Sequence, residues 1–380
     1  GKLPGGEAVR RLRRSAIDRF AAIGLPHRRI EEWKYTDLRA ALKEVPTIDL
    51  GAAPAPATSA GVSLAAALLQ PDSWIVEALE QALVDADGII ALNTALMHDG
   101  RIVDIAAGDR GRFDVVAAGS GTADSMAATV VLRNIIRVGA GANVLLVEDH
   151  RGERPVDRNV LTQLEVGDGA EVVHIVFTRA PVGRAHLVRW NVRLGAGAIY
   201  RPLQFADGGG LNRNELRLDF AGEQANFDFA GCALASGTSH ADTTLVIDHK
   251  VPNCVSRELF KTVLAGEAKV VFQGKVIVRP GAQKTDGKQM AKALMLSPVA
   301  EFDSKPELEI YADDVVCGHG STSAELDDDH LFYLRSRGIT EADARAMLTE
   351  AFVAEVYDRV ADPALADELR IIARAWLATV

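Results

Sequence analysis

A cysteine and a histidine that could share one metal ion stand two residues apart in the stretch Asp313-Asp-Val-Val-Cys-Gly-His-Gly-Ser-Thr322. If residues 315–319 form a β-strand, the side chains of Cys317 and His319 lie on the same face, roughly 6.6 Å apart along the backbone. A thiolate and an imidazole suit iron or zinc, but metal sites usually hold about three or four protein ligands. The pair therefore predicts a site completed at an interface, or else a half-buried thiol beside a solvated imidazole.

The other acidic, histidine and cysteine residues give weaker signals. Asp313 and Asp314 add negative charge that attracts ferrous iron, although a solvated turn is the commoner explanation. Three histidines stand alone on predicted strands or turns and are interpreted as structural: His174, His186 and His240. The three cysteines are far apart (Cys232, Cys254 and Cys317), so the sequence has neither a disulfide framework nor a Cys-x-x-Cys cluster motif.

The 380-residue chain has the composition of a globular protein with a sizeable core, since 48% of its residues are hydrophobic. Its formal net charge of -10 disfavours binding to nucleic acid or to an anionic membrane. Five arginines near the start are interpreted as a solvated helix face: Arg10, Arg11, Arg13, Arg14 and Arg19. No stretch approaches the roughly 18 apolar residues of a spanning helix, and no signal-peptide pattern is present, so we expect a cytoplasmic protein.

Glycine-rich turns recur at a fixed spacing in the middle of the chain. Gly139, Gly167 and Gly195 follow one another at intervals of 28 residues, within the segments Val-Gly-Ala-Gly-Ala, Val-Gly-Asp-Gly-Ala and Leu-Gly-Ala-Gly-Ala. Weaker copies start at Ala221 and, after an insertion, at Ala265. Each copy is typical of a turn, in which glycine takes positive φ at no steric cost, followed by a short strand.

Strands that recur at a fixed period predict a solenoid, because stacked coils bury an apolar face that one repeat cannot bury alone. We therefore expect a mainly β fold, a parallel β-helix, with a β-sandwich as the competing fold. The Gly-x-Gly pairs lack the third glycine and the following helix of a nucleotide-binding loop, and no Gly-x-x-x-x-Gly-Lys-Ser/Thr motif occurs. We do not expect these loops to bind phosphate.

Helical segments on both sides of the repeats suggest an N-terminal helical domain with a linker (1–100), the β-helix core (101–326) and a C-terminal helical domain (327–380). The first domain contains predicted helices at 6–24 and Ser73–Val84, with a linker around Pro54 and Pro56. In the last domain we expect helices at 328–337, from Thr340 to about 360 and from Pro363 onward. These helices either shield the open end of the solenoid or form a docking platform for a partner.

Four segments spread along the chain resemble the SufB/SufD family of iron–sulfur cluster assembly proteins. They are Pro26-His-Arg-Arg-Ile-Glu-Glu-Trp-Lys-Tyr-Thr-Asp-Leu38, Ala282-Gln-Lys-Thr-Asp286, the stretch 313–322 and Leu331-Phe-Tyr-Leu-Arg-Ser-Arg-Gly-Ile339. Within the family the chain is similar to the SufD branch. Leu334 stands where SufB typically has a cysteine, and Cys317-Gly-His319 stands where SufB has a Glu-His pattern.

The resemblance implies a right-handed parallel β-helix between helical domains, in a non-enzymatic scaffold subunit of the SufBCD complex. It implies that the solenoid pairs with a SufB-like scaffold and that the C-terminal helices bind a SufC-like ABC ATPase, with Phe352 and Glu355 as expected contacts. Cys317 and His319 would then contribute to an iron or nascent-cluster site at the SufB contact. The implied cargo is transient iron or an iron–sulfur cluster, and we expect none to be tightly bound by the isolated chain.

Two other interpretations remain open. Parallel β-helices include enzymes that cut acidic polysaccharides, but these are usually exported, and this sequence has no export signal. A structural homodimer that pairs through a solenoid edge is the second, and we expect one when SufB is absent. Gln283 to Asp286 are interpreted as a loop that fixes strand register, and Trp33 and Tyr35 as anchors of the N-terminal segment.

Overall fold

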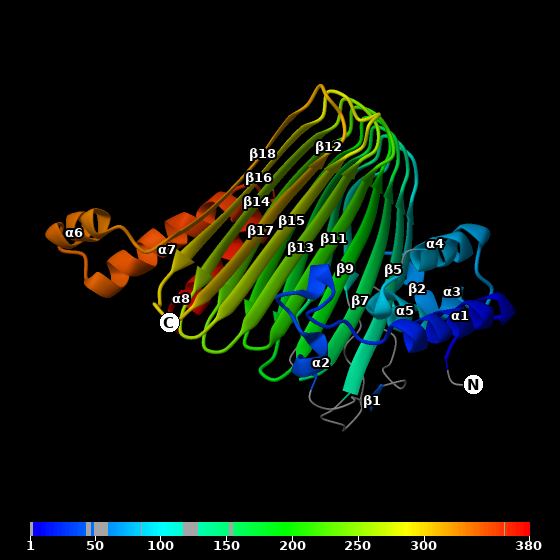
Figure 1. Cartoon of the computed structure of the whole chain (residues 1–380), viewed down its shortest axis with the longest axis horizontal. Helices are drawn as coiled ribbons and strands as arrows, with labels where there is room; N and C mark the ends of the chain where they lie inside the picture. The colour runs from blue at the N-terminus through cyan, green and yellow to red at the C-terminus, as the bar shows by residue number, and fades with distance from the viewer. Residues whose placement is uncertain are drawn as a thin grey trace.

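Two β-sheets face each other across a common interior and form a solenoid of about seven coils (Figure 1). The structure is a computed structural model that describes residues 3–42, 47–48, 60–84, 86–116, 128–151, 155–360 and 362–380. From β3 onward, consecutive strands alternate between the two sheets, and each strand pairs in parallel with the strand two positions later. The fold is the predicted parallel β-helix rather than a β-sandwich. The linker around Pro54 and Pro56 lies outside the described residues.

The strands of the larger sheet run from the N-terminal edge to the last coil. In order along this ten-stranded sheet, they are β2 (Val62–Ser63), β3 (Arg101–Ile105), β5 (Ala128–Val138), β7 (Asp157–Val166), β9 (Ala185–Leu194), β11 (Leu211–Phe220), β13 (His240–His249), β15 (Lys269–Val278) and β17 (Glu301–Ile310), with β1 (Thr47–Ile48) paired to β5. Only β2 pairs antiparallel among these described strands.

The smaller, eight-stranded sheet forms the opposite wall. Its strands are β4 (Arg110–Val116), β6 (Asn143–His150), β8 (Glu171–Ala180), β10 (Ile199–Gly208), β12 (Asn226–Ala235), β14 (Val255–Leu264), β16 (Asp286–Met295) and β18 (Val316–Ala324). One ten-residue strand in each sheet, together with two short turns, fills the 28-residue period seen in the sequence.

The two glycines of each repeated turn have different roles. Gly141, Gly169 and Gly197 take positive φ, which L-residues with a side chain rarely adopt. Gly139 is required for another reason: a Cβ there would lie 2.5 Å from the backbone nitrogen of Ala107 in the preceding coil. Positive φ was expected of the turn glycines in general, and the structure shows it at the second glycine of each pair.

The weak repeat at Ala265 is not a further copy of the same turn. It connects β14 to β15 and therefore lies on the opposite edge of the solenoid from the turns at Gly139, Gly167 and Gly195. The apparent insertion before Ala265 is thus a change of edge, because any turn between stacked strands favours the same small residues.

Alternate residues of every strand point inward and stack in columns, because parallel strands pair in register. One column contains Val144, Val172, Tyr200 and Phe227, all of which are buried. The rings of Tyr200 and Phe227 stack with their centroids 6.0 Å apart. This continuous apolar interior stabilises every coil through its neighbours.

The N-terminal helices cover the outer face of the ten-stranded sheet. They are α1 (Glu7–Ile23), the short 3₁₀ turn η1 (Glu31–Trp33), α2 (Leu38–Ala41), α3 (Leu64–Ala67), α4 (Ser73–Val84) and α5 (Gly88–Leu96), and α5 contacts β5 and β7. The predicted helices at 6–24 and Ser73–Val84 are present. Arg13, however, is buried and donates to the carbonyl oxygens of Ala95 and Pro4, so α1 is not a uniformly solvated arginine face.

A segment around Trp33 holds the N-terminal region against the later coils. Trp33 is buried, and the guanidinium of Arg213 on β11 lies 3.9 Å from its ring centroid. Thr36 donates to Asp242 on β13, and Glu31 pairs with Lys305 on β17. The predicted anchoring by Trp33 is present, whereas Tyr35 stays half-buried beside Lys34.

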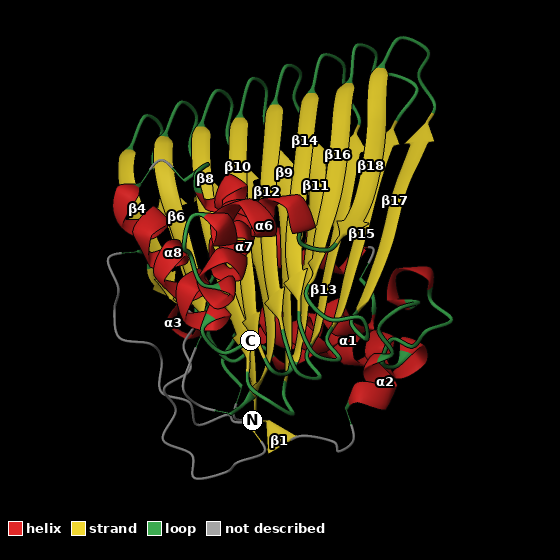
Figure 2. Ribbon diagram, turned by 90° about the vertical axis from the view of Figure 1, so that its left-hand side faces the viewer, coloured by secondary structure: helices red, strands yellow, loops and turns green. Residues whose placement is uncertain are grey.

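The C-terminal helices α6 (Asp328–Ser336), α7 (Glu341–Tyr357) and α8 (Pro363–Leu377) match the predicted segments. Figure 2 shows α7 and α8 lying over the outer face of the eight-stranded sheet, where α7 contacts β12 and β14. Their apolar residues bury Val147, Phe205 and Leu259. They therefore do not shield the open end of the solenoid, where β17 and β18 are the last strands among the described residues. No helix of the described chain is long and apolar enough to span a membrane.

Candidate functional site at the open end of the solenoid

Cys317 and His319 lie on β18, the edge strand of the eight-stranded sheet. The strand pairs in register with β16, so that Cys317 stands beside Gly287 and His319 beside Gln289. Gly287 and Gln289 face the solenoid interior, and Cys317 packs against the same apolar core. The two side chains therefore share the inward face, as their spacing predicted, but His319 is exposed because no further coil covers it.

The two edge strands offer unequal backbone surfaces to a partner. The N–H of Val316 donates to Thr285 next to β16, so the N–H groups two, four and six residues later point the same way. The N–H groups of the intervening residues Cys317, His319 and Ser321 consequently point away from β16, toward the open side. On β17, Pro306 occupies an open-side position by the same alternation and offers no N–H there. β18 is thus the better edge for adding a strand.

Two inward columns end at this open end. The column below Cys317 contains Gly287 and then Ser256, and the column below His319 contains Gln289 and then Glu258. Ser256, Glu258 and Gln289 are buried polar residues in an otherwise apolar interior. Glu258 Oε1 and Gln289 Oε1 have no hydrogen-bond partner in the described structure. The edge pair therefore sits on a polar base rather than on aliphatic side chains.

Burial controls the protonation of the titratable residues beneath the edge pair. It raises the pKa of Glu258 to about 8, against the opposing effects of a hydrogen bond with Ser256 and of Arg257. Burial also raises the pKa of the Cys317 thiol, a backbone hydrogen bond from Gly287 opposes this, and the charges of Asp286 and Glu258 add to it. His249, which lies 3.2 Å from Ser256 Oγ, has its pKa lowered to about 4 by burial. Near neutral pH, Glu258 is thus protonated and His249 is unprotonated, so neither adds charge beneath the edge strand.

The described residues of this chain alone do not complete a metal site. Among them, no group of three or more histidine, cysteine, aspartate and glutamate side chains is arranged to hold a metal ion. Asp314 is paired with Lys284, which neutralises much of the negative charge expected to attract iron, and Asp313 is exposed in the same turn. Any iron at Cys317 and His319 therefore needs ligands from elsewhere.

Two family models match the chain. A sequence model described as "SUF system FeS cluster assembly, SufBD core domain" matches residues 120–352, and one of the "SufBD protein N-terminal region" matches residues 5–59. The chain belongs to the SufBD family.

Relatives of this SufBD protein match it along most of its length. It is 29% identical to the iron-sulfur cluster assembly protein SufD of Escherichia coli, over 93% of this chain and 89% of that protein. A SufBD family protein of Synechocystis is also 29% identical, over 94% and 89% of the two chains. One of Mycobacterium leprae is 33% identical over 62% and 61%. The chain is therefore a SufD-like member of a family of iron–sulfur cluster assembly proteins.

A second polar cluster lies inside the SufBD core, far along the solenoid from Cys317. Glu148 accepts hydrogen bonds from His150 Nε2 at 2.8 Å, His174 Nε2 at 3.1 Å and Thr162 Oγ1 at 2.9 Å. Tyr200 lies 2.9 Å from the other ring nitrogen of His174. Burial opposes and the two histidines favour the charged carboxylate, and the pKa of Glu148 falls to about 2. His174 thus satisfies a buried carboxylate, in agreement with a structural role.

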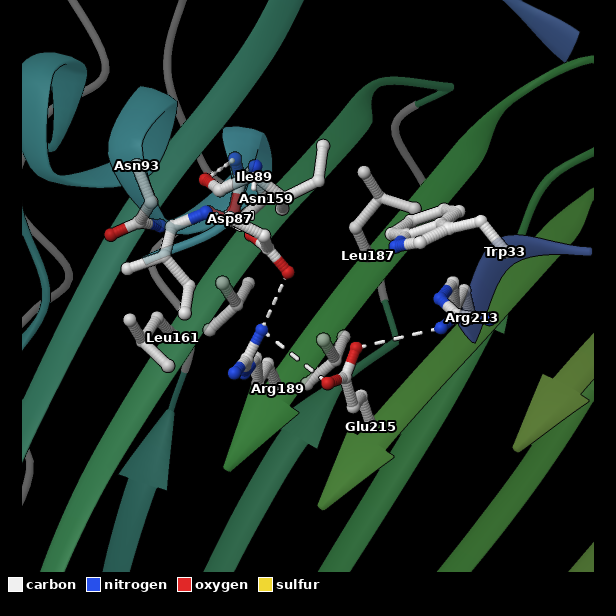
Figure 3. A pocket seen from close by; sticks show the side chains of 13 residues that line it. Trp33, Asp87, Ile89, Asn93, Asn159, Leu161, Leu187, Arg189, Arg213 and Glu215 are labelled. Atoms are coloured by element: carbon white, nitrogen blue, oxygen red, sulfur yellow. Dashed lines mark hydrogen bonds and ion pairs between the residues drawn. The ribbon is translucent and has the colours of Figure 1, made fainter. Parts of the chain in front are cut away.

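A small cavity lies where the N-terminal segment meets the ten-stranded sheet (Figure 3). Asp87, Arg189, Glu215 and Arg213 alternate in charge along its wall, with 2.8 Å between Arg189 Nη1 and Asp87 Oδ2. Trp33 closes one side. Its volume of about 20 Å³ is enough for roughly one water molecule, so we assign it no substrate.

The remaining predicted residues have intramolecular partners. The Phe352 carbonyl oxygen and the Glu355 carboxylate both bind Lys261 on β14, although Glu355 remains exposed on its outer side. His186 is buried, lies 3.3 Å from the Val156 carbonyl oxygen, and has its pKa lowered to about 3 by burial. His240 lies 3.1 Å from Thr36 Oγ1.

The loop before β16 connects neighbouring coils. The Gln283 carbonyl accepts from the Asn253 N–H at 2.9 Å, and Lys284 donates through its backbone to Asp314. Arg257 binds the carboxylate of Asp286 at 2.5 Å. These contacts join the loop to the coil below and to the coil above. The polar residues 283–286 therefore hold the register between neighbouring coils.

Sequence reasoning missed Ser256, Glu258, Gly287 and Gln289. They come from strands about one and two coils before Cys317, and only the pairing of β14, β16 and β18 brings them beneath it. The sequence gives only a weak signal: Ser256 and Glu258 are polar at alternate positions of β14, but Arg257, Lys261 and Thr262 on the same strand are polar as well.

Proposed function

We propose that this chain is the SufD-like subunit of an iron–sulfur cluster assembly complex, pairs with a SufB-like scaffold through its open end, and contributes Cys317 and His319 to an interfacial site for iron or a nascent cluster. The observation that carries the proposal is the position of both residues on β18, an edge strand whose open side has backbone donors to offer. A partner strand added there would lie directly beside the pair.

Two ligands on this chain are consistent with a shared site. A thiolate and an imidazole are suitable ligands for ferrous iron and for iron–sulfur clusters, and the missing ligands would come from the SufB-like chain. The cargo is transient iron or a cluster held at this interface rather than by the isolated chain. In the absence of SufB, the same edge supports a homodimer, because two copies of β18 could pair across a twofold axis.

The C-terminal helices are the proposed docking platform for a SufC-like ABC ATPase. Phe332 and Tyr333 on α6 are 74% and 56% exposed, which is unusual for large aromatic side chains without a partner. Beside α6, a groove of about 250 Å³ is lined by Leu296, Glu325 and Arg345 among others. Phe352 and Glu355 remain proposed contacts, but their bonds to Lys261 give them a structural role as well.

ATP hydrolysis belongs to the partner in this proposal. The sequence has no phosphate-binding loop motif, and its Gly-x-Gly turns serve coil stacking. The chain is thus a non-catalytic subunit whose contribution is positional: it places two ligands at an interface and links that interface to the ATPase platform.

The test is reconstitution of the complex with SufB-like and SufC-like chains from one organism, under anaerobic conditions. We expect His319→Ala to assemble a normal complex that binds less iron and acid-labile sulfide, and Arg110→Ala, exposed on β4 at the opposite end of the sheet from β18, to serve as the control. Unchanged iron and sulfide in the His319→Ala complex would remove this residue from the mechanism. ATP hydrolysis by the isolated chain would contradict the division of labour.

A further inference from the structure

The exposed arginines of the N-terminal region differ from those of the rest of the chain because they have no acidic partner. Among the described residues, nearly every exposed arginine of the solenoid and of the C-terminal helices forms an ion pair, as Arg193 does with Glu165 at 3.2 Å. Arg110 and Arg337 are the exceptions there. In the N-terminal region, five exposed arginines have no ion pair with a described residue, and we call them the arginine surface: Arg10, Arg14, Arg28, Arg29 and Arg39.

The arginine surface lies on a helix whose position is fixed by other contacts. Arg10 and Arg14 are on the exposed face of α1. Near the other end of this helix, Arg19 Nε donates to a carbonyl oxygen of the α4–α5 connection at 2.7 Å. The guanidinium of Arg39 lies beside Gly24, where a Cβ would be 3.7 Å from its Nη2. The backbone that carries these charges is therefore already ordered, which lowers the entropy cost of binding a partner.

Exposed apolar side chains lie among these arginines. Ile17 and Ile23 on α1 are 40% and 43% exposed, and Val84 at the end of α4 is 60% exposed. The two helices are neighbours, since α1 contacts both α4 and α5. Arginine is enriched at protein–protein interfaces, because its guanidinium binds carboxylates while its apolar stem packs against aliphatic side chains. The composition of this region is that of a protein-binding surface.

The sign of the charge selects an acidic partner. The whole chain has a formal net charge of -10 and an isoelectric point of about 5.5, so this positive region is a local exception. Asp18 is exposed on the same helix, but the five arginines outnumber it. Nucleic-acid-binding domains are usually basic as a whole, with an isoelectric point roughly above 9, and a long polyanion would meet the acidic remainder of this chain. A folded acidic protein needs only the local patch.

We propose that the arginine surface binds the acidic surface of another protein. Figure 1 shows α1 and α6 at opposite ends of the molecule, and β18 is the strand of its sheet farthest from β4. The arginine surface is therefore free when partners occupy the open end and the C-terminal helices. The inference goes beyond the proposed function. If that function holds, the occupant is an acidic protein that delivers sulfur or takes up the cluster.

The experiment measures the binding of fluorescently labelled poly-L-glutamate to the isolated full-length chain by fluorescence anisotropy. Low ionic strength is used, because salt screens exposed charges. We expect Arg10→Glu/Arg14→Glu and Arg28→Glu/Arg29→Glu each to weaken binding about tenfold, since each replaces two attractive charges with two repulsive ones. Added salt should weaken binding to the wild type and narrow this difference.

The matched control is Arg110→Glu/Arg337→Glu, which changes the net charge by the same amount at exposed arginines outside the arginine surface. Circular dichroism checks that each variant keeps its fold. Equal affinities of the three double variants would overturn the proposal, because binding would then follow net charge alone. Tighter binding of single-stranded DNA or of phosphatidylserine vesicles than of poly-L-glutamate would overturn it too, because the partner would belong to another class.

The arginine surface and the proposed function can fail separately. Arg10→Glu/Arg14→Glu should still form the complex with SufB-like and SufC-like chains, because neither residue lies on β18 or on the C-terminal helices. Absence of that complex with the wild-type chain would contradict the proposed function and leave poly-L-glutamate binding unchanged. Loss of the complex in Arg10→Glu/Arg14→Glu alone would show that these arginines belong to an interface within the complex, which contradicts the present inference.

Discussion

At the scale of single residues, Glu258 is a buried acid two coils below the open edge strand. Its side chain lies under the exposed His319, in register with Gln289, and burial rather than a neighbouring charge controls its protonation. An uncharged acid is tolerated in an apolar interior because it avoids the cost of burying a carboxylate. The residue therefore adds a polar group to the site without adding charge.

The raised pKa of Glu258 makes stability depend on pH. Because the folded-state pKa, about 8, exceeds that of an unfolded glutamate, the folded state binds the proton more tightly. Its stabilising contribution is present below about pH 4 and is lost as the pH rises to about 8, on the order of a few kcal/mol. We expect Glu258→Gln to flatten this fall, as measured by urea unfolding at several pH values.

The control for that measurement is Glu267→Gln, in an exposed turn. Its pH dependence should match that of the wild type. A Glu258→Gln variant whose stability falls as steeply as that of the wild type between pH 5 and pH 8 would show that another group titrates there.

Residue-scale prediction from sequence succeeded where the signal was local. The two-residue spacing of Cys317 and His319 was enough to place both on one face, because strand geometry fixes side-chain alternation. The position of Ser256, Glu258 and Gly287 beneath the edge strand could not be predicted, because it depends on which strands pair and in which register. The roles of Cys317, His319, Phe352 and Glu355 remain predictions.

At the scale of elements, the turn on one edge of the solenoid combines close backbone stacking with a residue in the left-handed backbone conformation. Gly139 and Gly141 are two residues apart in the same turn, so variants at both compare the two requirements in one context. An alanine at Gly139 would meet the backbone of Ala106 and Ala107, whereas one at Gly141 meets nothing within 4 Å but keeps a φ of 66°.

We expect Gly139→Ala to destabilise the protein by about 1–3 kcal/mol and Gly141→Ala by about 1 kcal/mol, because a backbone clash must move a whole coil. Thermal unfolding followed by circular dichroism measures both. A larger loss for Gly141→Ala would show that conformational strain, rather than stacking, limits the turn.

The Trp33 segment is an element held by a few specific contacts. Trp33 packs with Leu38, Ile89 and Leu211 and lies over Arg213. We expect Trp33→Ala to cost about 3–5 kcal/mol in segment docking and to accelerate hydrogen exchange of the strands it covers. Tyr35→Ala, at a half-buried position, is the comparison; equal exchange in both variants would argue against anchoring by Trp33.

At the scale of the whole molecule, assembly is expected to proceed through β18. Ser321 has its N–H on the open side, whereas that of Thr322 faces β16. We expect Ser321→Pro to leave the melting temperature unchanged while abolishing both the homodimer and the complex with a SufB-like chain, because it removes one pairing donor and adds a ring at the edge. Analytical ultracentrifugation measures the assembly state.

Thr322→Pro provides the contrast, since it removes a donor that faces β16 within the chain. It should lower the melting temperature. If Ser321→Pro still forms both assemblies, pairing does not use this edge, and the interface proposal has to move to another surface.

The overall architecture was more predictable than the site. A glycine turn repeated every 28 residues was sufficient for a parallel β-helix, and the capping residues placed α6, α7 and α8. The sequence did not predict the position of those helices. Apolar residues on α7 and α8 could have covered an open end or a sheet face, and the surface that they cover is made of outward apolar residues from β6 to β16 of the eight-stranded sheet.

The strand β14 connects two regions that the proposal treats separately. Its outward face carries Lys261, which binds the Phe352 carbonyl and Glu355 of the ATPase platform, and its inward face carries Ser256 and Glu258 beneath Cys317. A force applied to α7 therefore acts on the same strand that lies beneath the edge site, because β14 contacts α7 on its outer face and carries the inward columns on its other face. A displacement of α7 that carried β14 with it would move Ser256 and Glu258 beneath Cys317 and His319.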